Sequence, residues 1–168
     1  MAITTQAQFF LNAYRILERN EAALQAEQKR RAQRQNLDHS DSPSVDQVCY
    51  ATDEHIGVSD FVCLAFSVEL FVKAVFEALG RRQRGHNIRE LFEKLPPDVQ
   101  TKIAEIHMRN IYHWTLDDYK DQMDVISKGF EEFRYSHEHK ELFYHKGFAL
   151  KMIDAVRQVI DDIRAQKQ

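Results

Sequence analysis

Hydrophobic residues recur at helical spacing along most of the chain. The first such segment runs from about residue 4 to 34, and its far end, residues 26–35, is polar and basic. Its apolar stripe follows the i, i+3, i+4, i+7 pattern of an amphipathic helix and comprises Phe10, Ala13, Tyr14, Leu17 and Leu24. We therefore expect a long first helix whose far end projects beyond the core.

Residues 36–58 show no clear period and hold Asp, Ser, Pro and Gly, which predicts a long connection. A structureless loop of about 20 residues is uncommon in a compact domain, so short helix or a mobile flap is expected within it. The next segment, residues 59–79, is apolar nearly all round, as in a helix at the centre of a bundle. On that helix Glu69 and Lys73 have the i, i+4 spacing of an ion pair, and Gly80 ends it.

A polar loop then leads into a short amphipathic helix over residues 88–95, which Pro96 and Pro97 stop. Pro97 is predicted to open the following helix, because a first helical residue needs no N–H partner. The residues expected to face inward from that helix are Val99, Ile103, Ile106, Asn110 and Trp114.

Thr115 is predicted to cap a further helix. The apolar positions of this helix are Leu116, Tyr119, Met123, Ile126, Phe130 and Phe133. After a polar break, a last helix from about Phe148 carries Leu150, Ile153, Val156, Ile160 and Ile163. No segment shows the alternation typical of a strand, so we predict an all-α fold, a single bundle of five to six helices spanning residues 1–168.

Composition limits the classes of protein to which the chain is expected to belong. No apolar run approaches the ~20 residues that span a bilayer, and the first residues do not form a secretory signal. Cys49 and Cys63 have neither metal nor redox spacing, which predicts reduced thiols in a cytoplasmic protein. The net charge of −3 argues against a general nucleic-acid coat but leaves room for a local basic groove.

The loop after residue 80 is locally basic. It and the start of the next helix carry His86 and the candidate RNA-binding residues Arg81, Arg82, Arg84 and Arg89. Together with the basic stretch at residues 29–34, this loop could grip a polyanion. The alternative is a solvated loop and a solvated helix tip, which the acidic net charge favours.

The stretch FRYSHEH, residues 133–139, combines an arginine with two histidines. Arg134 can fork onto phosphate oxygens, and His137 and His139 can exchange protons near neutral pH. These residue types suffice for phosphodiester chemistry without a metal. Alternatively, Arg134 forms an i, i+4 ion pair with Glu138 at a helix end. A metal site at the two histidines would require a third ligand that the sequence does not fix, so no metal is predicted.

Three stretches in this order resemble the HEPN domain family. SVELFVKAVFEALG, residues 67–80, resembles its central helix, with an acid, a leucine and a lysine four residues after the acid. GHNIRELFEKL, residues 85–95, resembles the turn and short helix that follow. FRYSHEH falls where HEPN domains carry an arginine and, four to six residues later, a histidine. The resemblance covers about residues 61–165.

The resemblance implies an all-α bundle that often dimerises and, where active, a metal-independent endoribonuclease without cofactor. Arg134 and His139 would be catalytic, with His137, Tyr135 and Glu138 as accessory candidates, in a composite site between two protomers. The products would be 2',3'-cyclic phosphate and 5'-hydroxyl ends.

The family also occurs in toxin–antitoxin and phage-defence systems, so a separately encoded nucleotidyltransferase-type antitoxin is an expected partner. Active members commonly carry Asn, Asp or His where this chain has Tyr135. The alternative interpretation is therefore an inactive HEPN bundle that binds nucleotide, RNA or a partner protein. Neither interpretation identifies the RNA substrate or the pathway.

Overall fold

The computed structural model describes residues 2–38, 59–109, 115–134 and 146–167, and this part of the chain is helical without any strand. Its helices are α1 (Ile3–Asp38), α2 (Ser59–Ala78), α3 (Ile88–Glu93), α4 (Pro97–Met108), α5 (Leu116–Arg134) and α6 (Lys146–Ala165). The predicted all-α fold is confirmed.

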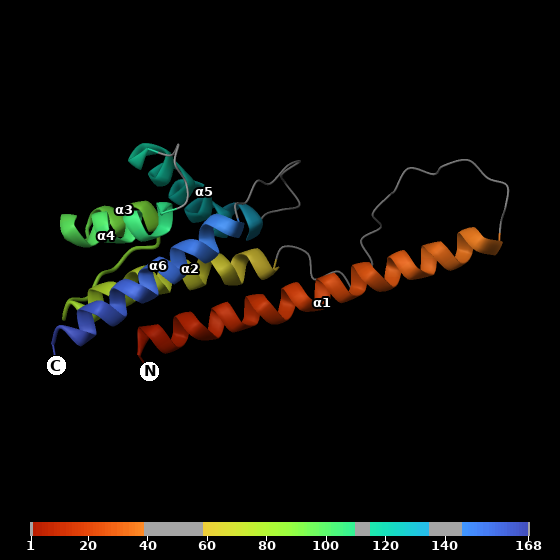
Figure 1. Ribbon diagram of the computed structural model, residues 1–168, viewed down its shortest axis with the longest axis horizontal. Coiled ribbons are helices and arrows are strands. Elements are labelled where there is room, and N and C mark those ends of the chain that lie inside the picture. Colours follow the sequence, from red (N-terminus) through yellow and green to blue (C-terminus); the bar gives the residue numbers. More distant parts are fainter. Residues whose placement is uncertain (1, 39–58, 110–114, 135–145, 168) are drawn as a thin grey trace.

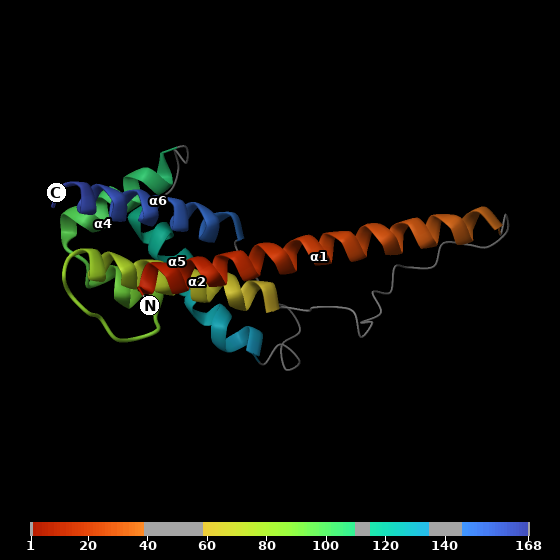
Figure 2. The ribbon, with the colours of Figure 1, turned by 90° about the horizontal axis from the view of Figure 1, so that it is seen from below.

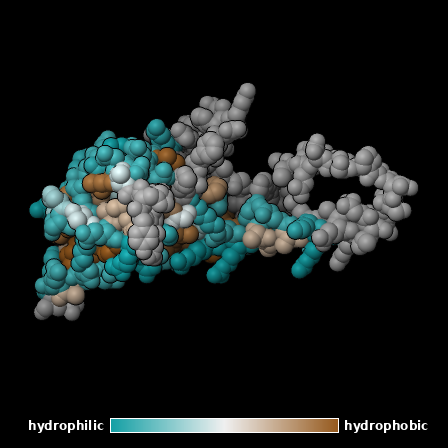
Figure 3. All heavy atoms as spheres, turned by 45° about the horizontal axis from the view of Figure 1, so that its top comes forward, coloured by the Kyte–Doolittle hydropathy of each residue, from teal (hydrophilic) through white to brown (hydrophobic). Residues whose placement is uncertain are grey.

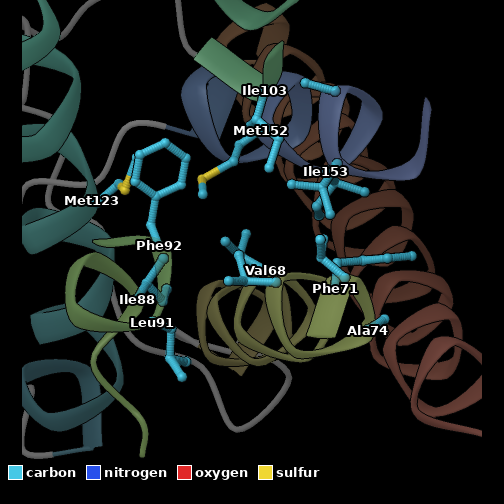
Figure 4. Packing of buried hydrophobic residues seen from close by; sticks show 14 of the residues in the cluster. Val68, Phe71, Ala74, Ile88, Leu91, Phe92, Ile103, Met123, Met152 and Ile153 are labelled. Atoms are coloured by element: carbon cyan, nitrogen blue, oxygen red, sulfur yellow. The ribbon is translucent and has the colours of Figure 1, made fainter. Parts of the chain in front are cut away.

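The central position predicted for α2 is also confirmed. It packs against α1, α6, α5 and α3, while α4 lies against α6 (Figure 1). Figure 4 shows Val68 and Phe71 of α2 facing a core to which α6 contributes Met152 and Ile153. Because its neighbours cover it on several sides, α2 has no wholly polar face, which explains its predominantly apolar sequence.

The buried face of the first helix coincides only in part with the predicted stripe, and Tyr14 belongs to both. Ala7, Leu11 and Tyr14 are buried, whereas Phe10 is 36% exposed and stacks on Phe66 with ring centroids 5.2 Å apart. The small side chain of Ala7 lets α2 approach closely enough for the Ser67 hydroxyl to donate to the Ala7 carbonyl at 3.0 Å. The far end of α1 extends beyond the rest of the bundle, as predicted (Figures 1 and 2).

Predicted helix boundaries are confirmed where the local chemistry is specific. Gly80 follows α2 with a φ of +76°, a conformation that glycine adopts without strain. Pro97 is the first residue of α4. Thr115 and Asp118 cap each other before α5: the Thr115 hydroxyl accepts from the Asp118 N–H at 3.1 Å, and the Asp118 carboxylate accepts from the Thr115 N–H at 2.8 Å.

One predicted inward position is wrong. Leu116 is 47% exposed because the first residue of α5 precedes its contact with the bundle. Ile106 is half-buried and packs against the core, as predicted. The neighbouring His107, which was not among the predicted inward residues, is more deeply buried, and its ring packs against Tyr119 and Phe148. The predicted inward residues Asn110 and Trp114, and the side chains of Phe130 and Phe133, lie outside the described part.

The surface shown in Figure 3 is largely hydrophilic, with small hydrophobic areas between the charged side chains. Among the described residues, the large hydrophobic side chains that are exposed are Phe9, Phe10, Ile16 and Leu116. None of the described helices combines the length and the apolar composition needed to cross a membrane.

Candidate functional site

A buried carboxylate on α2 is the focus of the polar groups that the structure brings together. Glu69 is only 6% exposed. Its Oε1 accepts from Lys73 Nζ at 2.7 Å, which confirms the predicted i, i+4 pair. His86 Nδ1 lies 3.2 Å from Oε1 and 3.4 Å from Oε2 of the same carboxylate. A carboxylate only accepts hydrogen bonds, so this contact places a proton on His86 Nδ1.

The local sequence explains how His86 reaches a helix that it follows by 17 residues. Gly85, with a φ of +116°, turns the loop back toward α2. Asn87 then caps α3, and its side-chain oxygen accepts from the Glu90 N–H at 2.9 Å. In this Gly-His-Asn sequence, the glycine makes the turn, the histidine contacts the Glu69 carboxylate, and the asparagine caps α3.

Helix α5 holds this turn from the other side. The Ile88 N–H donates to Ser127 Oγ at 2.9 Å, and Ser127 Oγ donates to the Met123 carbonyl at 2.8 Å. Ile88 is 2% exposed, so the serine oxygen satisfies a backbone donor that water does not reach easily. The turn with His86 is thus linked to both α2 and α5.

Arg134 is the last residue of α5, seven residues beyond Ser127. At 1.5 Å per residue, its backbone lies about 10 Å further along the helix, nearly two turns on. In both ribbon views the last turns of α5 lie beside the first turns of α2 (Figures 1 and 2). Tyr135, His137, Glu138 and His139 lie outside the described residues, and so does the predicted pair of Arg134 with Glu138.

The arginines of the basic loop divide into two groups. Arg81, Arg82 and Arg84 are exposed and form no ion pair with another described residue. Arg89 is instead surrounded by carboxylates: its guanidinium lies 2.5 Å from Asp124, 3.3 Å from Glu93 and 3.5 Å from Asp121.

The hydrogen bond that Arg89 donates to Asp124, followed by the one it donates to Glu93, raises the pKa of Arg89 above its ordinary value. Its charge is already compensated within the protein. The loop also begins at the end of α2 opposite to the one that α5 approaches with Arg134 (Figure 1). Within one chain, the loop therefore begins at the opposite end of α2 from the last turns of α5 and then returns to Glu69, in the middle of α2.

The predicted site residues do not include Glu69, Lys73 and His86, although the first two are predicted to pair. A carboxylate and a lysine inside an otherwise apolar helix were the available signal, because such groups are rarely buried without partners. Across the described ranges, no three His, Cys, Asp or Glu side chains converge as metal ligands would. His137 and His139, the alternative metal ligands considered above, lie outside those ranges.

The comparison with protein families agrees with this arrangement. A family model described as HEPN domain matches residues 60–166. The chain belongs to the HEPN domain family. The match begins in the first turn of α2, excludes the whole of α1, and includes Glu69, the His86 turn and Arg134. No curated protein and no solved structure matched the chain. Family membership supports a ribonuclease-like or nucleotide-binding helical domain.

Proposed function

We propose that this HEPN domain is a metal-independent endoribonuclease that acts as a homodimer, with Arg134 and His139 as its catalytic pair. The observation that carries the proposal is the family match over residues 60–166, which includes all three motifs. Two of those motifs are in contact, since His86 is bound to Glu69. The third begins at the end of α5, the helix that holds the His86 turn through Ser127.

The proposed reaction is an attack of the RNA 2'-hydroxyl on the adjacent phosphorus. One histidine removes the hydroxyl proton, and a second donates a proton to the leaving 5'-oxygen. The P–O bond to the 5'-oxygen breaks as the new bond forms, giving a 2',3'-cyclic phosphate and a 5'-hydroxyl. Arg134 stabilises the charge on the phosphorane oxygens. A two-fold dimer presents the same motif twice, so His139 of each protomer can take one of the two roles.

Residues around this pair have supporting roles in the proposal. His137, Tyr135 and Glu138 are accessory residues beside the catalytic pair. Arg81, Arg82 and Arg84 contribute RNA binding, with Arg81 and Arg82 at the start of a loop that begins at the other end of α2. Arg89 contributes less, since its carboxylate partners compensate its charge. No metal or cofactor enters this mechanism.

The test is RNA cleavage by purified protein in the presence of EDTA. We expect wild-type protein to leave cyclic phosphate ends, and both Arg134→Ala and His139→Ala to lose at least about 100-fold in rate, as for loss of an electrostatic or acid–base group. Arg109→Ala is the matched control, because Arg109 is exposed and has no ion pair with a described residue. Cleavage that survives in both variants would contradict the catalytic assignment.

The alternative is an inactive bundle that binds nucleotide, RNA or a partner protein, favoured by Tyr135 at the position after Arg134. It predicts RNA binding without cleavage by a folded dimer, with binding reduced in Arg81→Ala and Arg84→Ala. A role in toxin–antitoxin or phage defence extends the first proposal. It predicts that expression of wild-type protein arrests growth, that His139→Ala does not, and that a separately encoded nucleotidyltransferase-type antitoxin restores growth.

A further inference from the structure

A cavity of about 320 Å³ lies between the first turns of α1 and the last turns of α6, with α2 beneath it. None of its lining residues comes from α5 or from the loop that carries His86. It lies at the end of the bundle where both chain termini are found, whereas α5 approaches the first turns of α2 (Figure 1). The cavity is therefore separate from the proposed catalytic motif.

One part of this cavity is apolar. Phe71 and Ile160 are each 1% exposed, so they form its closed floor. Phe9 stands at the rim and is 55% exposed, so its ring is accessible to a ligand. A ligand that covers the Phe9 ring removes apolar surface from water, which is favourable.

The other part carries charges of both signs. Arg157 and Asp161 have the i, i+4 spacing at which helical side chains readily pair, but neither forms an ion pair with another described residue. Arg164 also lines the cavity and donates to the Thr4 hydroxyl at 3.0 Å, a neutral partner that leaves its positive charge uncompensated. Two cations and one carboxylate are thus available next to the apolar floor.

We propose that this cavity binds a small zwitterion with an apolar side chain, of the class of the apolar α-amino acids. Arg157 and Arg164 bind its carboxylate, for which the guanidinium fork is suited. Asp161 binds its ammonium group, and Phe9 with Ile160 covers its side chain. The volume lies at the lower end of the range for small-molecule sites. A phosphate monoester fits less well, because it would place Asp161 against a like charge.

The proposal is tested by calorimetric titration of the full chain with L-phenylalanine and L-leucine. Phenethylamine lacks the carboxylate and 3-phenylpropionate lacks the ammonium group, so each is expected to bind at least about tenfold more weakly than L-phenylalanine. Adenosine monophosphate serves as the phosphate-bearing competitor. Equal or tighter binding of any of these three compounds overturns the zwitterion assignment, as does the absence of saturable heat with both amino acids.

Variants locate the site. Arg157→Ala and Asp161→Asn are each expected to weaken L-phenylalanine binding about tenfold, and Arg109→Ala to leave it unchanged. Both substituted side chains are exposed, so the fold is expected to persist, which circular dichroism checks. Unchanged affinity in both folded variants would place the amino acid elsewhere and overturn the proposal. RNA cleavage is a separate readout, so failure here leaves the ribonuclease proposal standing.

Discussion

Glu69 and His107 are both almost inaccessible to water, at 6% and 4% exposure, but their surroundings differ completely. Glu69 receives hydrogen bonds from Lys73 and His86. Neither ring nitrogen of His107 has a hydrogen-bond partner among the described residues, and its ring packs against the aromatic rings of Tyr119 and Phe148. Partners, more than burial, therefore decide whether a buried polar group carries a charge.

The consequence for His107 is a neutral imidazole. Burial, and secondarily the positive charge of Lys151, lowers its pKa from 6.5 to about 4. Burial also raises the pKa of the hydroxyl of Tyr119, the ring neighbour of His107, so Tyr119 is neutral as well. This part of the core is an apolar cluster that contains polar atoms, whereas the Glu69 cluster is a compensated set of charges at the edge of the core.

Removing the carboxylate of Glu69 is expected to have the largest effect. Glu69→Ala leaves Lys73, only 14% exposed, without its partner, and it releases His86. Loss of one member of a buried pair costs about 4 kcal/mol in the free energy of unfolding. Urea denaturation measures this loss, and Glu77→Ala, an exposed glutamate on the same helix, is the matched control within about 0.5 kcal/mol.

A double substitution separates the cost of an unpaired buried charge from the cost of lost packing. Replacing both Glu69 and Lys73 by leucine removes the two charges together, so the cost should be much smaller than that of Glu69→Ala alone. If the single and double variants lose the same stability, the charge pair is not what determines the cost. The fall in stability would then come from lost packing on α2.

Acid is expected to destabilise the protein through His107 by an amount of the order of 3 kcal/mol. The unfolded chain takes up a proton at a pKa near 6.5, but folded His107 does so only near 4. Between these values the unfolded state binds more protons, so stability falls as the pH decreases through this window. His107→Leu removes this contribution.

Urea midpoints at pH 7, 5 and 4 measure the effect as a difference between the two proteins. The carboxylates titrate in both proteins, so their contribution cancels in the comparison. We expect His107→Leu to lose less stability than wild type on acidification. Parallel pH profiles would mean that His107 gains a proton in the folded state as easily as in the unfolded state.

The same two residues show how far the sequence could predict the molecule. The Glu69–Lys73 pair follows from spacing within one helix, and the caps at Pro97 and Thr115 follow from local chemistry. The position of His107 does not, because it depends on rings from α5 and α6 that are distant in sequence. Helical periodicity favours the apolar Ile106 and passes over its polar neighbour His107, although His107 is the more deeply buried of the two.

The candidate site was predictable to a similar extent. The order of the three HEPN-like stretches along the chain could be read from the sequence. The match over residues 60–166 confirms the resemblance to the HEPN family. The contact of His86 with Glu69 could not be predicted, because it depends on the path of a loop turned by Gly80 and Gly85. The interaction of Arg89 with Asp124 likewise required the packing of α3 on α5.

The smallest expected effect concerns the hydrogen bond between Ile88, the first residue of α3, and Ser127 of α5. Ser127→Ala removes the only described acceptor of the buried Ile88 N–H, at a cost of about 1–2 kcal/mol. Thr101→Ala is the matched control, because that hydroxyl only bonds back to the Pro97 carbonyl on an exposed surface. Hydrogen exchange of the Ile88 amide should accelerate in the serine variant and not in the threonine variant.

This substitution also tests whether the buried pair and the end of α5 act together. If the turn positions α5 relative to Glu69, Ser127→Ala should slow RNA cleavage several-fold while Arg134 and His139 remain intact. Glu69→Ala should then slow cleavage as well, because it frees the same turn from α2. Faster exchange at Ile88 with an unchanged cleavage rate would show that the Glu69 cluster stabilises the fold without positioning the catalytic motif.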